Sequence, residues 1–125
     1  MKLKGTVQNG FGKGAAFVRL YSEKIKATAG FIPFPGTLNL IVNPLLRKVF
    51  LNSNGRKTIA EFEQNGITYG AVYLYDIKLE EVVDAAIIIP VRTTHNKEVM
   101  EIITAEDLRN RFNIENEAEV IIERK

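Results

Sequence analysis

The sequence lacks cysteine and tryptophan, and it has a single histidine among its 125 residues. Disulfides and thiolate metal sites are therefore excluded, and imidazole can supply at most one metal ligand. Its 17 basic and 15 acidic residues nearly balance, so charge alone does not favour binding to nucleic acid. The longest apolar run, 85–90, is too short to cross a bilayer. We therefore expect neither a nucleic-acid partner nor a membrane association.

Polar residues follow Met1–Gly5 where a signal peptide would have its apolar core. Together with the absence of cysteine, this pattern favours a cytoplasmic location. The length fits a single domain over residues 1–125. With 46% hydrophobic and 26% charged residues, the composition is that of an ordinary globular protein.

Short alternating or apolar segments dominate the chain and predict strands. They cover residues 2–8, 15–20, 37–42, 69–77, 84–90 and 118–122. Residues 61–69 predict a hairpin, because Asn65-Gly66 suits a type I′ turn in which both central residues have positive φ. The continuous apolar run at 84–90 indicates a strand buried on both faces.

One helix is predicted late in the chain. Thr104 and the acidic residues after it resemble a capping box, and Leu108 and Phe112 share a face at helical spacing. Asn113 would end this helix. Six or more short strands with one late helix indicate an all-β fold, a compact β-barrel.

Glycine at positions 10, 12 and 14 removes side chains from alternate positions. Such a backbone can approach a triphosphate and direct N–H groups at its oxygens, with Lys13 adding positive charge. The alternative is a glycine-rich hairpin turn. The segment is not a Walker A motif, and the strand character of the residues after it argues against a dinucleotide fingerprint.

Thr37 and Asn39 are two residues apart in the segment 37–42, which is predicted to be a strand. In a strand they point to the same face, where a hydroxyl and an amide oxygen could share one hard cation. Mg²⁺ takes few protein ligands and keeps water and phosphate oxygens, so this pair suits a metal that arrives with a nucleotide. The alternative is a surface pair or a turn cap.

Other residues could contact a ligand or transfer a proton. Phe31 and Phe34 could stack on a flat ring, although core packing is the commoner role of such residues. Thr93 could donate to a ligand oxygen, and His95 could act as a base or be structural. Glu101 interrupts an apolar stretch and could accept a hydroxyl proton, or it could simply be an exposed strand position.

Four motifs occur in a fixed order: 10–14, 30–39, 90–95, and 101–103 followed by 108–112. In this order they resemble the archaeal CTP-dependent riboflavin kinases over nearly the whole chain. The resemblance implies a six-stranded cradle-loop (riboflavin-kinase-like) β-barrel with one short C-terminal helix. It also implies transfer of the γ-phosphoryl group of CTP to the ribityl 5′-hydroxyl of riboflavin, giving FMN and CDP.

The same resemblance implies roles for individual residues. Nucleotide-binding positions are Phe11, Gly12, Lys13, Gly14, Ala15 and Ala16, with a second segment at Glu106, Asp107, Leu108 and Arg109. The magnesium ligands match Thr37 and Asn39, and the flavin contacts match Thr93 and Glu101. Glu101 is our hypothesis for the catalytic base; alternatively it only hydrogen-bonds the flavin chain, and the proton leaves to phosphate or water.

A second resemblance involves residues 108–114 and 120–122, which are similar to barrel transcription factors of the AbrB type. Those proteins bind DNA and form their barrel by dimerisation. The near-neutral charge, the length sufficient for a closed monomeric barrel, and the Gly36–Asn39 loop favour the kinase. A barrel that binds flavin or nucleotide without catalysis is a third possibility. We expect a monomer whose partners are riboflavin, FMN, CTP and CDP.

Overall fold

The computed structural model describes residues 1–8, 11–91, 98–107, 115 and 117–125, and the side chains from residue 14 of the first helix onward. Within this part of the chain the elements follow in the order β1 Lys2–Gln8, α1 Phe11–Ala29, β2 Leu38–Ile41, α2 Pro44–Phe50, β3 Lys57–Ile59, β4 Phe62–Gln64, β5 Ile67–Tyr69, β6 Val72–Leu79, β7 Val83–Pro90, β8 Val99–Thr104 and β9 Glu119–Arg124.

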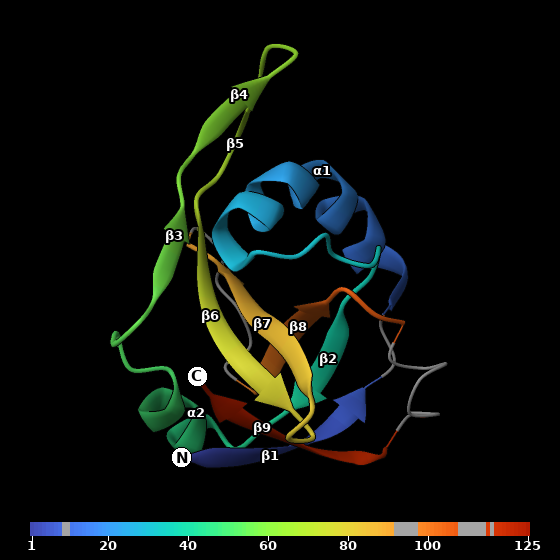
Figure 1. The fold of residues 1–125 in the computed structure, drawn as a ribbon, viewed down its shortest axis with the longest axis vertical. Coiled ribbons are helices and arrows are strands. Elements are labelled where there is room, and N and C mark those ends of the chain that lie inside the picture. The colour runs from blue at the N-terminus through green and yellow to red at the C-terminus, as the bar shows by residue number, and fades with distance from the viewer. Residues whose placement is uncertain (9–10, 92–97, 108–114, 116) are drawn as a thin grey trace.

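Six strands form a closed antiparallel ring in the order β6-β7-β8-β2-β1-β9, and β9 pairs back onto β6. Closure pairs every ring strand on both sides, which removes the open edge of a flat sheet. Strand β3 adds to β6 outside the ring, and β4–β5 form a separate hairpin that extends beyond the barrel (Figure 1). The predicted six-stranded barrel is confirmed, and it closes within one chain.

The barrel interior is the larger core. Side chains from all six ring strands fill it, and Phe50 from α2 joins them with 1% of its surface exposed. Helix α1 lies across the outside of the barrel, where Val18, Tyr21 and Ile25 pack on β6, β7 and β8 (Figure 1). Strand β7 is therefore buried on both faces, as its continuous apolar run predicted.

The prediction of a strand over residues 15–20 was wrong, because these residues belong to α1. Val18, Tyr21 and Ile25 follow each other at helical spacing, and they are the side chains that face the barrel. The alternative of a glycine-rich hairpin turn was wrong for residues 11–14, which form the first turn of the same helix.

The prediction of a single, C-terminal helix was also wrong. In the described residues there are two helices, and both precede residue 51. Thr104 ends β8 and donates its hydroxyl to the Asp84 carbonyl at 3.0 Å, while Ala105 and Glu106 form a bend. Thr104 is therefore not a helix N-cap. Leu108, Phe112 and Asn113 lie outside the described residues.

Helix α2 was not predicted, although its start carries a standard signal. Pro44 occupies the first turn, and the Asn43 side chain accepts hydrogen bonds from the amides of Leu45 and Leu46 at 2.9 and 3.2 Å. An N-cap asparagine followed by proline is typical of a helix start.

The hairpin over residues 61–69 formed as predicted. Asn65 and Gly66 have φ values of 54° and 77°, as a type I′ turn requires. The long strand predicted at 69–77 is interrupted at Gly70, whose carbonyl accepts the Tyr21 hydroxyl at 2.9 Å. This contact ties α1 to the segment between the hairpin and the barrel.

Candidate active site

Thr37 and Asn39 lie at the start of β2 with their polar groups together. The Thr37 hydroxyl donates to Asn39 Oδ1 at 3.3 Å, and only 2% of Thr37 is exposed. Neighbouring ligands of an octahedral Mg²⁺ with bonds of about 2.1 Å are about 3 Å apart, so the two oxygens are spaced as such a pair. The predicted convergence of these side chains is thus present, and the pair fits a small hard cation.

The first turn of α1 packs directly against this pair. A Cβ atom built on Gly14 would lie 2.8 Å from Thr37 Cγ2 and 3.0 Å from Thr37 Cβ. Such distances are below normal van der Waals contact, so any larger residue would force the helix or Thr37 to move. Gly14 is therefore required for close packing, and it brings the glycine-rich segment beside the Thr37–Asn39 pair.

Glu101 lies directly across from Asn39. In the antiparallel pairing of β2 with β8, Asn39 is the partner of Glu101 and Leu38 is the partner of Ile102. Opposed residues point to the same face with Cβ atoms about 5 Å apart. The proposed metal ligand and the proposed base are thus neighbours on the outer face of the barrel.

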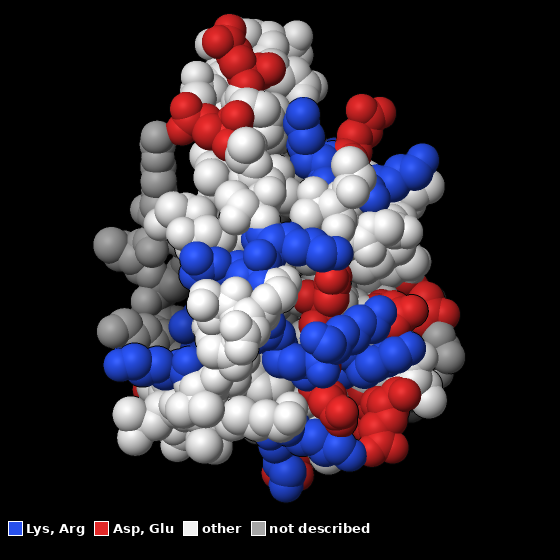
Figure 2. Space-filling model, turned by 60° about the vertical axis from the view of Figure 1, so that its left-hand side comes forward, with Lys and Arg blue, Asp and Glu red and all other residues white. Residues whose placement is uncertain are grey.

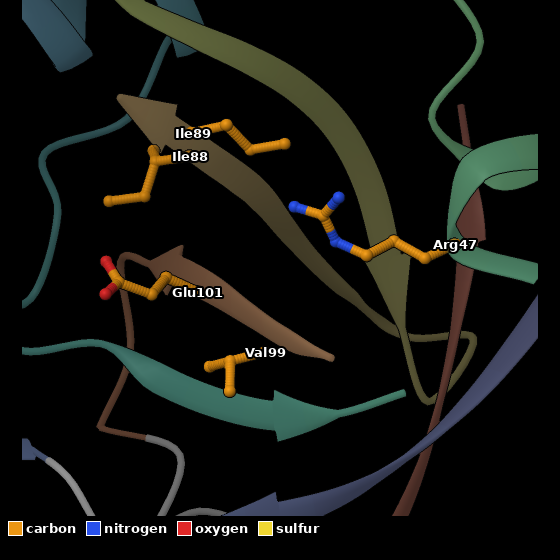
Figure 3. A pocket seen from close by; sticks show the side chains of 5 residues that line it. All are labelled: Arg47, Ile88, Ile89, Val99 and Glu101. Atoms are coloured by element: carbon orange, nitrogen blue, oxygen red, sulfur yellow. The ribbon is translucent and has the colours of Figure 1, made fainter. Parts of the chain in front are cut away.

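Strands β7 and β8 separate beside Glu101. Their paired register runs from Ala85↔Thr104 to Ile88↔Glu101, while β7 continues to Pro90 and β8 begins at Val99. A small cavity of about 20 Å³ lies at this point, lined by Arg47, Ile88, Ile89, Val99 and Glu101 (Figure 3).

Arg47 reaches this cavity from α2. In Figure 3 its guanidinium and the carboxylate of Glu101 lie toward opposite sides of the pocket. Arg47 and Ile89 also line a groove of about 510 Å³, together with Pro44, Leu45, Lys48, Leu51, Arg56, Tyr73 and Tyr75. Burial lowers the pKa of the Arg47 guanidinium from its ordinary value, an effect opposed by its interaction with Tyr75.

A second groove follows β8 to its other end. It has a volume of about 300 Å³, and Phe31, Thr104 and Glu106 are among its lining residues. Glu106 and the next residue, Asp107, both predicted to bind nucleotide, are partly buried. Phe31 packs beside the cluster under α1, whereas Phe34 is 44% exposed and donates its amide to the Thr104 carbonyl at 2.7 Å.

The remaining predicted residues divide into two groups. Ala15 and Ala16 lie in the first turns of α1, near Gly14, and Phe11, Gly12 and Lys13 contribute helix backbone there. Thr93, His95, Leu108 and Arg109 lie outside the described residues. The structure therefore brings together Gly14, Thr37, Asn39 and Glu101, with Glu106 two residues past the end of β8.

Charge is mixed on the face that carries α2. Figure 2 shows Lys and Arg side chains gathered across it with Asp and Glu among them. Ion pairs among the described residues include Lys57–Asp76 at 2.7 Å and Lys78–Asp84 at 2.7 Å. The described residues contain no group of three or more His, Cys, Asp or Glu side chains arranged to hold a metal.

Sequence reasoning missed Arg47 as a residue of this site. The sequence did contain a signal for the helix that carries it. Asn43-Pro44 is typical of a helix start, and a helix beginning at Pro44 has Arg47 as its fourth residue. No helix in the described part of the chain has the length and apolar character needed to span a membrane.

Comparison with known proteins supports one family. The family model CTP-dep_RFKase, described as a domain of unknown function (DUF120), matches residues 7–123. A riboflavin kinase of Saccharolobus solfataricus is 37% identical over 98% of this chain and 73% of that protein. A riboflavin kinase of Methanobrevibacter smithii is 36% identical over 98% of this chain and 99% of that protein.

A riboflavin kinase of Methanospirillum hungatei is 39% identical over 98% of this chain, and the match spans 57% of that protein. The matches thus cover nearly all of this chain, while the relatives differ in how much sequence they carry beyond it. On the family match and these identities, the chain belongs to the CTP-dependent riboflavin kinase family.

Proposed function

We propose that this chain transfers the γ-phosphoryl group of CTP to the ribityl 5′-hydroxyl of riboflavin, forming FMN and CDP. Family membership supports the reaction class. The observation that carries the proposal is the β2–β8 register, because it sets Asn39 of the Thr37–Asn39 pair opposite Glu101. A pair of oxygens suited to a phosphate-bound cation next to a carboxylate is the arrangement that phosphoryl transfer to an alcohol needs.

The three proposed subsites follow β8 in order. The flavin chain is assigned to Glu101. The metal is assigned to Asn39, the β2 partner of Glu101, and to Thr37, which precedes the next paired residue, Leu38 opposite Ile102. Glu106, for the nucleotide, lies beyond the end of β8 in the groove with Phe31. Phosphates extending from a nucleotide in that groove would pass the Thr37–Asn39 pair and meet the acceptor hydroxyl beside Glu101.

The start of α1 supports a role in holding phosphate. The first amides of a helix have no intrahelical partner, and the helix dipole places partial positive charge there. Phe11–Ala16 occupy this first part of α1, and Gly14 abuts Thr37. We assign phosphate binding to these backbone groups, with Lys13 contributing charge. We assign recognition of the cytosine base to a second segment, Glu106, Asp107, Leu108 and Arg109.

Mg²⁺ held by Thr37 and Asn39 would offset charge on the phosphates. In the transfer the ribityl oxygen forms a bond to the γ-phosphorus and the bond from that phosphorus to the CDP oxygen breaks. The hydroxyl proton goes to the Glu101 carboxylate, which acts as general base. Thr93 is assigned to the flavin chain, where it would hold the hydroxyl in line with the phosphorus.

The test is direct assay of the purified chain with riboflavin, CTP and Mg²⁺, with FMN and CDP separated by chromatography. We expect stoichiometric FMN and CDP, and much less FMN when ATP replaces CTP. Flavin binding without FMN from either nucleotide would indicate a barrel without catalysis. Absence of FMN together with salt-sensitive DNA binding would overturn the proposal in favour of the AbrB-type alternative.

A further inference from the structure

Helix α1 meets the proposed metal pair through a residue that has no side chain. A Cβ atom built on Gly14 would lie 2.8 Å from Thr37 Cγ2, and it would lie closer still to the Thr37 hydroxyl oxygen. That same hydroxyl donates to Asn39 Oδ1 at 3.3 Å. The Thr37 oxygen proposed to bind Mg²⁺ therefore borders the space that any side chain at position 14 would enter.

Beyond this contact, α1 is fixed on the outside of the barrel. Val18, Tyr21 and Ile25 are buried there, and they follow Gly14 at helical spacing, so all four share one face of the helix. Rings of the β4–β5 hairpin pack edge-on against Tyr21, and the Tyr21 hydroxyl donates to the Gly70 carbonyl at 2.9 Å. A shift of α1 away from Thr37 would disturb all of these contacts.

Thr37 has fewer constraints of its own. Strand β2 begins at Leu38, so Thr37 lies just before the ladder that pairs β2 with β1 and β8. Only 2% of Thr37 is exposed, and the backbone of Gly14 is one of the surfaces that cover it. A methyl group at position 14 would therefore displace the Thr37 side chain more readily than it would displace α1.

We propose that Gly14 is a positioning residue for the metal ligand Thr37. The bare backbone of α1 at this point sets the direction of the Thr37 hydroxyl and couples the start of α1 to the Thr37–Asn39 pair. This inference rests on the proposed function, in which the pair holds Mg²⁺ and the start of α1 holds phosphate. Groups that orient a metal ligand influence metal affinity although they do not touch the metal.

The test measures the affinity for CTP by calorimetry, once with Mg²⁺ and once with EDTA, in the unchanged protein and in Gly14→Ala. Ile25→Val is the matched control, because it loosens the buried face of α1 about three helical turns from Gly14. Riboflavin affinity, from quenching of flavin fluorescence, and the melting temperature are measured for each variant.

We expect Gly14→Ala to lower the affinity for CTP in Mg²⁺ roughly 10- to 100-fold, the range for loss of a group that orients a metal ligand. The affinity for CTP in EDTA and the affinity for riboflavin should stay within about threefold, as should all three affinities in Ile25→Val. An equal loss of CTP affinity with and without Mg²⁺ would overturn the inference, because Gly14 would then act on the nucleotide directly.

Asn39→Ala provides an independent check. If Gly14 acts through the pair, Gly14→Ala/Asn39→Ala should bind CTP in Mg²⁺ within about threefold of the weaker single variant, whereas losses that multiply would contradict the inference. Should Gly14→Ala not fold, Gly14→Ala/Thr37→Ser, which lacks Thr37 Cγ2, is compared with Thr37→Ser. An equal response of these two variants to Mg²⁺ would overturn the inference.

The binding measurements need no turnover, so they are independent of whether FMN is formed. Absence of any effect of Mg²⁺ on CTP affinity in the unchanged protein would overturn the inference even if FMN is produced. Absence of FMN with the expected Mg²⁺ response would instead count against the proposed function alone.

Discussion

The two ends of the β7–β8 ladder differ in what lies beside the last paired residues. At one end Ala85 pairs with Thr104, and the Thr104 hydroxyl donates to the Asp84 carbonyl at 3.0 Å. At the other end the pairing stops at Ile88↔Glu101, and a small cavity lined by Arg47 and Glu101 lies beside it. The first end, here called the closed end, is stabilised by its own contacts, whereas the second, the open end, borders a cavity beside the proposed base. Substitutions at the two ends should therefore affect different properties.

The largest effect is expected from Glu101→Gln at the open end. Glutamine keeps the size of the side chain but cannot take a proton, so turnover should fall roughly 100- to 10,000-fold with the fold intact. Steady-state rates of FMN formation and the melting temperature are the measurements. Near-normal turnover would mean that Glu101 only hydrogen-bonds the flavin chain and that the proton leaves to phosphate or water.

Asn39→Ala should follow in size. Removal of a direct metal ligand should raise the Mg²⁺ concentration needed for activity at least roughly 10- to 100-fold, since even outer-shell changes have effects of that order. The barrel should stay folded, because Asn39 is only partly buried and lies on the outer face of the barrel. Titration of activity with Mg²⁺ is the measurement. An unchanged Mg²⁺ dependence would remove Asn39 from the metal site.

Thr104→Val at the closed end should lower the stability of the fold. The substitution keeps the shape of the side chain and removes the donor to the Asp84 carbonyl, which should lower the free energy of unfolding by about 1 kcal/mol. Denaturant unfolding measures this loss. An unchanged free energy of unfolding would contradict the structural role given to this hydrogen bond.

The smallest expected effect is on the pH dependence of stability, through Asp84 at the closed end. Lys125 and Lys78 hydrogen-bond the Asp84 carboxylate and lower its pKa from 3.8 to about 2. A depressed pKa in the folded state contributes stability above pH 3.8, and this contribution is lost as the pH falls toward 2. The side chain is 58% exposed, so the effect should be below about 1 kcal/mol.

Asp84→Asn should remove this part of the acid dependence of unfolding. Paired melting curves of the two proteins between pH 2 and 5 give the comparison. A difference between the curves that grows above pH 4 would contradict the predicted direction.

Local sequence signals identified the elements whose structure depends on their own residues. Asn65-Gly66 predicted its turn because few other residues tolerate positive φ at two consecutive positions. The apolar run of β7 predicted burial on both faces. Thr37 and Asn39 were expected to point the same way because extended backbone has a period of two.

The elements that were wrong or missed depend on contacts between distant segments. Glycine at 12 and 14 indicated a loop, but α1 includes both positions because its apolar face packs on β6, β7 and β8, and Gly14 fits against Thr37. Tertiary packing can override weak local preference in this way. Arg47 gave no sign of function, since its proximity to Glu101 arises only when α2 packs at the end of the barrel.

The sequence by itself determined the nearly neutral charge, the absence of thiol chemistry, the β-rich composition and the ordered motifs of one kinase family. Only the tertiary structure decided that the ring closes through β6 and β9, that Asn39 faces Glu101, and that β7 and β8 separate beside Arg47. The physical reason is that hydrogen-bond register and helix packing join residues far apart in the chain, and no local pattern encodes those pairings.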